Sequence, residues 1–277
     1  MTGKPRIVIL SGSGAPAIAA ANRYHVRLGG RFEIHVVEER NLTLARVITT
    51  LRRRWRKAGL EAVLDLLFLR LALHILGDSS HAPMRSYVPK MHCRDINSPA
   101  VLSFLQSQQA DWLITNGCSI AGEALLNCAP SRRLNVHNGI TPRYRGTGNF
   151  WAIREGNPAL VGVTVHRLDS GIDTGDRISV GAINIRDPRC SSLAGMDIAA
   201  FEEGAERVSD YILEGRQGVP AEFSRLPDGY YSYPGLSDWL VANRNLKRWR
   251  MTGAKAEDTW RASFNDYAKD ESKDAFQ

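Results

Sequence analysis

The sequence is poor in cysteine, and its cysteines are not grouped. Its 277 residues include four, Cys93, Cys118, Cys128 and Cys190, and none of them forms a Cys-x-x-Cys pair. Disulfide scaffolds and zinc knuckles need denser and more regularly spaced thiols. We therefore expect reduced thiols, no bound metal and a reducing compartment, the cytoplasm.

The sequence also lacks a signal peptide and an uninterrupted apolar span. Its start, Met-Thr-Gly-Lys-Pro-Arg, runs directly into the strand-like Ile7–Leu10, which is not the order of regions in a signal peptide. The leucine-rich stretch 60–76 is interrupted by charged residues, whereas a spanning helix needs about 20 mostly apolar residues in succession. We expect neither a secretory leader nor a membrane-spanning helix.

The segment 46–76 is nevertheless unusual, because a basic cluster, Arg52–Lys57, precedes the leucine-rich stretch. One interpretation is a buried helix or helix pair whose basic end is solvated or packs on a partner subunit, as in a homodimer. The other is an interfacial helix that gives peripheral contact with an anionic membrane. We favour the buried helix, because the segment is apolar nearly all round rather than on one face.

Composition and charge set only broad bounds. With 43% hydrophobic and 23% charged residues, the chain has the composition of an ordinary soluble protein, long enough for one large domain and an appendage. A net charge of +7 permits an anionic ligand or a phosphate-bearing substrate without requiring either. We expect no nucleic-acid partner.

Residues 133–148 carry the most informative motif. They place Asn135 and His137 two positions apart at the end of an apolar run, before a loop rich in proline and glycine. Residues i and i+2 of a strand share one face, so the amide and the imidazole project together. The turn-rich segment 169–176 follows with three carboxylates. An amide, an imidazole and a carboxylate together can hold an oxyanion and move a proton, as acyl transfer requires.

The order of apolar runs and helix signals predicts an α/β protein with a doubly wound, mostly parallel sheet. We expect strands at 6–10, 32–37, 111–115, 134–137, 161–168 and 177–185, the last antiparallel to its predecessor, and helices at 97–109, 121–126, 150–155 and 192–213. Ligands of such sheets bind outside the carboxyl ends of the strands. The end of the 134–137 strand and the loop after residue 10 should therefore open on one edge.

That loop reads Ser11-Gly12-Ser13-Gly14 and leads into a helix-like segment with Pro16 in its first turn. Glycines let backbone N–H groups approach an anion at a helix N-terminus. The loop matches neither Gly-x-Gly-x-x-Gly nor a Walker loop, so a plain tight turn is an equal alternative.

In combination these motifs resemble the folate-dependent formyltransferase superfamily, which includes glycinamide ribonucleotide transformylase, methionyl-tRNA formyltransferase and the amino-sugar N-formyltransferases. The resemblance rests on Asn-x-His with the following Pro and Arg-Gly, on Gly162–His166, and on Asp-x-Gly-x-Asp-Thr-Gly at 169–175. Two positions depart from the family pattern. Ser119-Ile120-Ala121 stands in place of Arg-Ile-Leu, and Gly139–Pro142 in place of Ser-Leu-Leu-Pro.

The resemblance implies formyl transfer from 10-formyltetrahydrofolate to a primary amine on a Rossmann-like core. It assigns proton transfer to His137, the oxyanion to Asn135 and orientation of the imidazole to Asp173, whereas His166 and Asp176 are expected to be structural. Donor-binding residues are expected at Cys118, Ser119, Ile120, Ala121, Asp169, Gly171 and Ile172, and substrate-binding residues at Ser11, Gly12, Ser13, Gly14, Arg143 and Arg145. Arg143 and Arg145 are explained equally well as solvated arginines of a loop.

We expect a catalytic domain at 1–215 with a helical insertion at about 46–90, and a C-terminal extension at 216–277. The extension has an aromatic cluster, Tyr230–Pro234, which would cover the sheet edge, and a tail, 253–277, expected to be disordered.

The acceptor follows only by elimination. The extension is short for the C-terminal barrel of methionyl-tRNA formyltransferases, and glycinamide ribonucleotide transformylases lack the insertion. We expect a small-molecule amine, a nucleotide-linked amino sugar or another specialised-pathway amine. The alternative acceptors are methionyl-tRNA and glycinamide ribonucleotide. The alternatives of another class are a hydrolase of 10-formyltetrahydrofolate and a catalytically inactive binding module.

Overall fold

The computed structural model describes residues 3–40 and 83–252, and between them only residues 52, 55–56, 59, 63–64 and 67–68. Most of the expected insertion at 46–90, with part of the basic cluster Arg52–Lys57, lies outside the described residues, as does the tail 253–277. The described residues of the insertion at 52–68 are helical, but Trp55, Leu64, Leu67 and Phe68 are exposed, so the favoured buried helix is wrong for these positions. The predictions for the residues outside the description stay predictions. Among the described residues, no helix has the length and apolarity needed to cross a bilayer.

A seven-stranded sheet forms the centre of the molecule, in the order β3-β2-β1-β4-β5-β7-β8. Its strands are β1 (Arg6–Gly12), β2 (Glu33–Glu39), β3 (Met91–Cys93), β4 (Trp112–Asn116), β5 (Arg133–His137), β7 (Gly162–Arg167) and β8 (Arg177–Ala182). The first five run parallel, whereas β7 is antiparallel to both β5 and β8. The predicted doubly wound, mostly parallel sheet is confirmed, and β1 and β5 end on the same edge.

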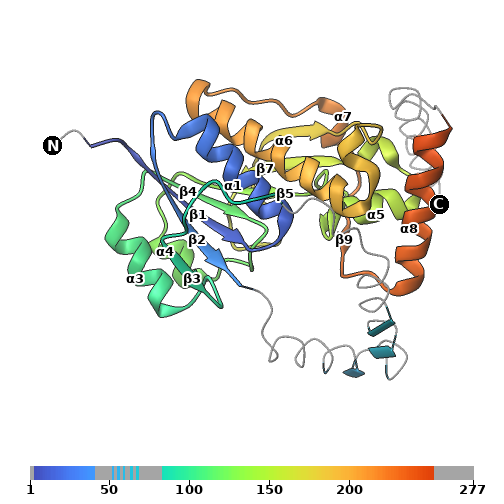
Figure 1. Cartoon of the computed structure of the whole chain (residues 1–277), viewed down its shortest axis with the longest axis horizontal. Helices are drawn as coiled ribbons and strands as arrows, with labels where there is room; N and C mark the ends of the chain where they lie inside the picture. Colours follow the sequence, from blue (N-terminus) through green and yellow to red (C-terminus); the bar gives the residue numbers. More distant parts are fainter. Residues whose placement is uncertain are drawn as a thin grey trace, which may run out of the picture.

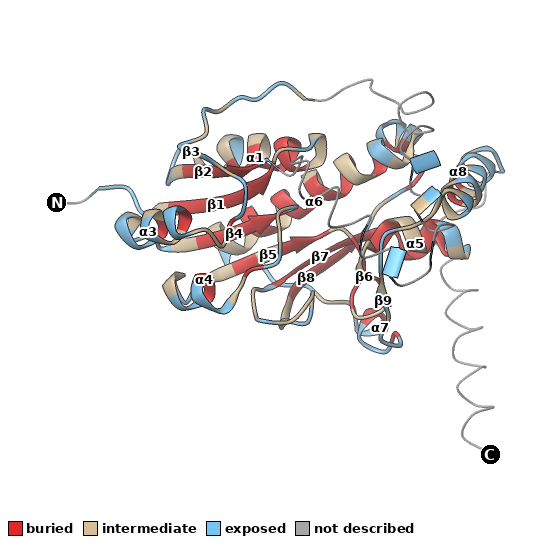
Figure 2. Ribbon diagram, turned by 90° about the horizontal axis from the view of Figure 1, so that it is seen from below, coloured by how far each residue is buried: buried red, intermediate tan, exposed pale blue. Residues whose placement is uncertain are grey.

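Helices cover both faces of the sheet (Figure 1). They are α1 (Ala15–Leu28), α3 (Pro99–Gln108), α4 (Glu123–Cys128), α5 (Gly148–Glu155), α6 (Leu193–Glu214), α7 (Ala221–Ser224) and α8 (Leu236–Met251), with 3₁₀ turns at Pro158–Leu160 and Pro188–Ser191. Alternate residues of β1 face opposite layers of helices. Ile7 and Ile9 pack in one apolar cluster with α1 and α6. Val8 and Leu10 pack in another cluster with α3 and α4. Apart from the edge strand β3, the strands of this sheet are accordingly mostly buried (Figure 2).

Several elements escape the sequence prediction. Besides the short α7, β6 (Arg145–Gly146) and β9 (Tyr230–Tyr231), residues 91–93 form the edge strand β3 and residues 236–251 form α8, and from the sequence we predict no strand or helix at any of these positions. The described residues 83–90 form no helix. They run along α1, where Asn22 accepts from the Ser86 backbone N–H at 2.8 Å and donates to the Met84 carbonyl at 2.8 Å.

The C-terminal extension is attached to the core rather than separate from it. Ala242 and Leu246 of α8 and Phe223 of α7 share an apolar cluster with Ile153 and Val180. The aromatic segment forms β9 (Tyr230–Tyr231), which pairs in parallel with β6 (Arg145–Gly146) in a separate two-stranded sheet. It therefore contacts the loop after His137 instead of covering the edge of the main sheet.

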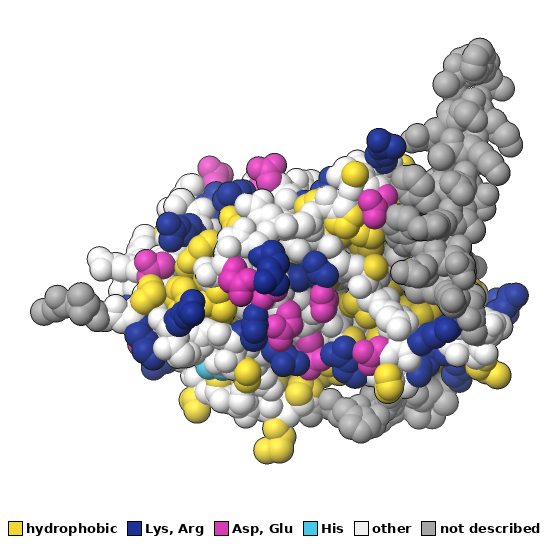
Figure 3. All heavy atoms as spheres, turned by 90° about the horizontal axis from the view of Figure 1, so that it is seen from above, with side chains coloured by type: hydrophobic (Ala, Val, Ile, Leu, Met, Phe, Trp, Pro, Cys, Tyr) yellow, Lys and Arg dark blue, Asp and Glu magenta, His cyan; other side chains and the backbone are white. Residues whose placement is uncertain are grey.

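Charges on the face that carries α1 and α6 are mixed. Arg23 and Arg27 of α1 pair with Glu206 of α6 at 3.1 and 2.9 Å, and Arg27 also pairs with Asp210 at 2.5 Å. Basic and acidic side chains are accordingly interspersed there (Figure 3). The positive net charge does not gather on this face as a patch of one sign.

Candidate active site

Asn135 and His137 lie at the carboxyl end of β5. Their neighbours Leu134 and Val136 point into the cluster under α1 and α6, so the amide and the imidazole point to the opposite face of the sheet. Loops that carry Tyr144 and Asp173 reach them there. The strand alternation predicted from sequence thus brings the two side chains together, with His137 almost fully buried.

Asp173 completes the cluster. Its Oδ2 lies 3.2 Å from His137 Nδ1 and accepts the Gly146 backbone N–H at 3.0 Å, and its Oδ1 accepts from Asn135 Nδ2 at 3.2 Å. Asp173 adopts the left-handed conformation, with φ of 55°, which Asp and Asn tolerate better than most residues. The three residues predicted as catalytic therefore converge in space.

The histidine and the carboxylate influence each other's ionisation. Burial lowers the pKa of His137, although the facing Asp173 carboxylate and the Tyr144 carbonyl act in the opposite direction. Burial alone would raise the pKa of Asp173, but the charge of protonated His137 and the hydrogen bond from the Gly146 N–H outweigh it and lower that pKa to about 2. Nε2 of His137 lies 2.6 Å from the Tyr144 carbonyl, which can only accept, so this nitrogen carries the proton of the neutral ring.

The Asn135 amide is fixed on both sides. Thr115 of β4 donates to Asn135 Oδ1 at 2.6 Å, and the amide nitrogen lies 3.0 Å from His166 Nε2. His166 Nδ1 lies 2.8 Å from the Arg167 carbonyl and must donate to it, which leaves Nε2 as an acceptor. Thr115 and Gly146 are site residues that sequence reasoning missed. A hydroxyl inside the apolar run of β4 was the available signal for Thr115.

The glycine loop lies at the carboxyl end of β1 on the same edge. The hydroxyl of Ser11 is buried and donates to the Gly12 and Ala17 carbonyls at 3.1 and 3.5 Å. A Cβ on Gly12 would lie 2.2 Å from the Gly117 carbonyl oxygen, so this glycine allows β1 and β4 to approach closely. Ser13 is partly exposed and Gly14 exposed at the start of α1. A phosphate role for these four residues stays a prediction.

The two loop arginines contact protein groups. Arg143 donates to Glu155 at 3.1 Å and lies over the Tyr144 and Tyr231 rings. Arg145 makes a two-point hydrogen bond with Asp228, at 2.8 and 2.7 Å, and donates to the Ile172 carbonyl at 3.2 Å. These contacts favour structural roles over the expected substrate contact.

The segment expected to border the donor contacts the buried Glu39 and the partly buried Asn97. The Ser119 backbone N–H and hydroxyl both donate to Glu39 at 2.7 Å, and the Ile120 carbonyl accepts from Asn97 at 3.0 Å. Cys118 and Ala121 share an apolar cluster with Leu168, so this segment and the start of the 169–173 loop are neighbours.

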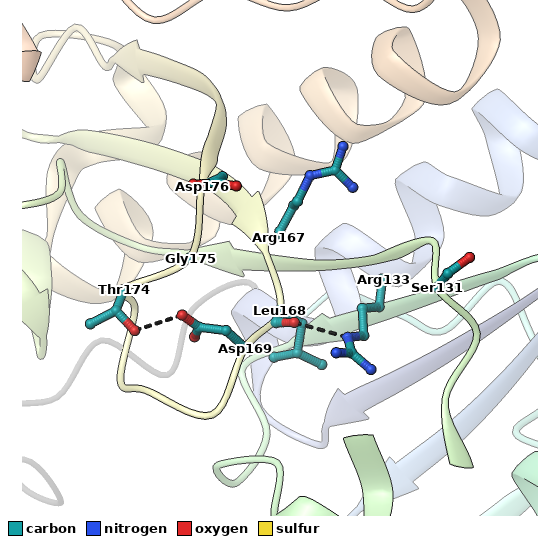
Figure 4. Close-up of a pocket in the computed structure, with 8 residues that line it drawn as sticks. All are labelled: Ser131, Arg133, Arg167, Leu168, Asp169, Thr174, Gly175 and Asp176. Carbon is teal, nitrogen blue, oxygen red and sulfur yellow. Dashed lines mark hydrogen bonds between the residues drawn. The ribbon is translucent and has the colours of Figure 1, made fainter. Parts of the chain in front are cut away.

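The loop 169–176 is shaped by its own side chains and borders a pocket. Asp169 accepts from the Gly171 N–H at 3.2 Å and from the Thr174 hydroxyl at 2.8 Å. An open pocket of about 300 Å³ lies beside it, at the end of β5 away from His137 (Figure 4). Polar side chains dominate its lining, which comprises Ser131, Arg133, Arg167, Leu168, Asp169, Thr174, Gly175 and Asp176.

The thiols and acidic side chains do not assemble a metal site in the described part of the chain. The four cysteines, all of which lie in the described part of the chain, form no disulfide. Over residues 3–40 and 83–252, no three His, Cys, Asp or Glu side chains are grouped so that they could hold a metal ion.

Comparisons with known proteins agree with this architecture. Residues 80–198 match the family model described as formyl transferase. A methionyl-tRNA formyltransferase from Anaeromyxobacter sp. (strain K) is 32% identical over 135 residues, which are 48% of this chain and 43% of the relative. The chain therefore spans less than half the length of that relative.

Two solved structures share the fold. A sugar N-formyltransferase from Shewanella sp FDAARGOS_354 has a TM-score of 0.51 at 11% identity, and a 4-N formyltransferase from Francisella tularensis has 0.51 at 12%. Both matches cover 87% of this chain and 87% of the other chain.

Proposed function

We propose, from the match of residues 80–198 to the formyl transferase family model, that the protein transfers a formyl group from 10-formyltetrahydrofolate to a primary amine. The observation that carries the proposal is the convergence of Asn135, His137 and Asp173 at the carboxyl edge of the sheet. Such an edge is where α/β proteins of this topology bind ligands. The four cysteines form no disulfide, which suits a reducing compartment, and we expect the enzyme in the cytoplasm.

His137 is the proposed proton carrier, and Nδ1 is the nitrogen that exchanges the proton. Nε2 is engaged by the Tyr144 carbonyl, so the neutral ring directs its Nδ1 lone pair toward Asp173. Because burial lowers the pKa of His137, this neutral form prevails at pH 7. Nδ1 accepts the proton that the amine loses as it attacks the formyl carbon, and Asp173 then stabilises the imidazolium. The same proton returns to the departing nitrogen of the donor, which restores the neutral ring.

Asn135 is the proposed oxyanion donor. Its two N–H groups point at His166 and Asp173, so the formyl oxygen must replace the longer of these contacts, the one to Asp173. Thr115 holds the amide oxygen and thereby keeps the nitrogen turned toward the site. Removing one oxyanion donor typically costs about a hundredfold or more in rate.

The donor would lie between the 118–121 segment and the 169–172 loop. When bound, it supplies the formyl carbon and the nitrogen that leaves. The Asp169 carboxylate at the start of this loop suits the amino groups of a pterin ring, and the apolar cluster that contains Leu168, Cys118 and Ala121 suits the face of that ring. The open pocket beside Asp169 lies at the opposite end of β5 from His137 and is not the proposed donor site.

A small-molecule acceptor is proposed over a macromolecular one. The Tyr230 ring is 56% exposed and borders Gly146, the residue that donates to Asp173. An exposed aromatic face beside a reaction centre suits a sugar or nucleobase ring. The named relative acts on methionyl-tRNA, which makes charged initiator tRNA the second candidate acceptor.

The test is a turnover assay with 10-formyltetrahydrofolate and four acceptor classes: nucleotide-linked amino sugars, amino acids, glycinamide ribonucleotide and charged initiator tRNA. We expect loss of the donor and appearance of a formylated small amine. Donor loss at the same rate without any amine would instead identify a hydrolase, and formylation of tRNA alone would overturn the acceptor assignment. An absence of any turnover would identify a binding module.

A further inference from the structure

We infer that residues 228–231 of the C-terminal extension position Asp173, and that Asp228 acts through Arg145 as a positioning residue of the active site. The inference rests on the proposed function, because it assumes that Asp173 works with His137. In this inference the C-terminal extension contributes to catalysis as well as to folding.

Two consecutive residues of the loop after His137 hold two consecutive residues of the Asp173 loop. Arg145 Nη1 donates to the Ile172 carbonyl at 3.2 Å, and the Gly146 N–H donates to Asp173 Oδ2 at 3.0 Å. One contact fixes the backbone immediately before Asp173, and the other fixes its carboxylate.

Residues 228–231 fix Arg145 and Gly146 in turn. Asp228 accepts two hydrogen bonds from the Arg145 guanidinium, at 2.8 and 2.7 Å. The Arg145 N–H donates to the Gly229 carbonyl at 3.0 Å, and Gly146 pairs with Tyr231 in the two-stranded sheet. A two-point contact between a planar guanidinium and a carboxylate restricts direction as well as distance. The side chain of Arg145 is therefore aimed at Ile172 rather than free to turn.

The Asp173 loop needs support of this kind from outside. Asp173 has φ of 55°, and a non-glycine residue in that region is held there by its surroundings. Within the loop, Asp169 bonds Gly171 and Thr174 and thereby restrains the residues on either side of Asp173. Among the described residues, the Arg145 and Gly146 contacts act directly on the Ile172–Asp173 step.

A different role for Arg145 predicts different kinetics. If Arg145 bound a phosphate of the acceptor, Asp228 would compete for it, and Asp228→Asn would lower the acceptor KM. Positioning through Ile172 predicts the opposite pattern, a lower kcat with the acceptor KM unchanged, because only the catalytic carboxylate is displaced.

The experiment compares Asp228→Asn, Asp228→Glu and Arg145→Ala with a matched control, Asp238→Asn, in the full chain. Asp238 also belongs to the extension and also pairs with a core arginine, Arg154, at 3.0 Å, but that pair lies on α5 and α8 rather than on the Asp173 loop. Asp228 is 63% exposed, so its replacement should leave the fold intact, as melting temperature will check.

We expect Asp228→Asn to lower kcat about five- to tenfold with the acceptor KM within twofold. Asp228→Glu should recover most of the loss, and Asp238→Asn should stay within twofold of the wild type. The double variant Asp228→Asn with Arg145→Ala should have the same kcat as Arg145→Ala alone. An altered acceptor KM with unchanged kcat would overturn the inference, as would an equal loss of kcat in Asp238→Asn.

A measurement without turnover separates this inference from the proposed function. The imidazole ¹⁵N resonances of His137 report its surroundings, which comprise Asp173, His166, Arg145 and the Tyr144 carbonyl. We expect Asp228→Asn to shift them and Asp238→Asn to leave them in place, even if no amine is formylated. Unshifted resonances in Asp228→Asn would refute the positioning role whatever the reaction is.

Discussion

Replacing Asp173 by Asn removes one charge and little else. Asn has nearly the same shape and also tolerates the left-handed backbone that φ of 55° requires. Asp173→Ala, in contrast, would add backbone strain to the loss of the carboxylate. The Asn variant therefore isolates the electrostatic contribution of this residue to folding and to catalysis.

The structure sets the size of the effect on stability. The pKa of Asp173 falls from its ordinary 3.8 to about 2, and each pKa unit corresponds to about 1.4 kcal/mol, so the carboxylate stabilises the fold by about 2.5 kcal/mol at most, and by less where His137 is neutral and its charge is missing. The side chain is only 12% exposed, so solvent screening reduces this figure little. Because the pKa is lower in the folded state, the contribution is present above pH 4 and is lost as pH falls toward 2.

Urea unfolding of both proteins at pH 7 and pH 3 provides the measurement. We expect Asp173→Asn to unfold with less free energy than the wild type at pH 7, by at most about 2.5 kcal/mol, and with a smaller deficit at pH 3. Formyl transfer should fall about a hundredfold, because the imidazolium loses its counter-charge. Equal stability at pH 7, or a deficit that does not shrink in acid, would refute the electrostatic reasoning.

Three further substitutions test other contacts. Gly146→Ala should lower the free energy of unfolding by about 2 kcal/mol or more in urea, because φ is +85° and a Cβ would lie 2.2 Å from the Tyr231 carbonyl oxygen; an unchanged value would contradict this. Burial raises the pKa of Asp197 to about 7, against the opposing hydrogen bond from Asn138, so this carboxyl costs stability as pH rises from 4 through 7. Asp197→Asn should therefore gain up to about 4 kcal/mol in the free energy of unfolding at pH 8 and little at pH 4, and an equal gain at both values would contradict the assignment. Thr115→Val should lower kcat about tenfold with donor affinity kept, since it frees the amide of Asn135 to turn, and Thr115→Ser should restore most of the rate.

The alternation of side chains along a strand allows the pair Asn135 and His137 to be predicted from the sequence. Asn135 and His137 share a face because β5 is extended, and that local rule needs no knowledge of the rest of the fold. The carboxylate of Asp173 could be predicted only from the family resemblance, because its approach depends on how two loops close over the sheet.

The missed features depend on contacts between distant segments. Thr115 meets Asn135 through the register of β4 against β5, and Asp228 meets Arg145 across 83 positions. Neither contact leaves a periodic pattern in the chain. The edge strand β3 has only three residues, and α8 has many polar residues in its first and last turns, so both give weak signals.

The central claim is that His137 carries the proton in formyl transfer, and single-turnover kinetics of His137→Asn test it most directly. We expect the rate of formyl transfer to fall by a factor on the order of a thousand while the Kd of the formyl donor stays within threefold. A variant that transfers formyl as fast as the wild type would contradict the account.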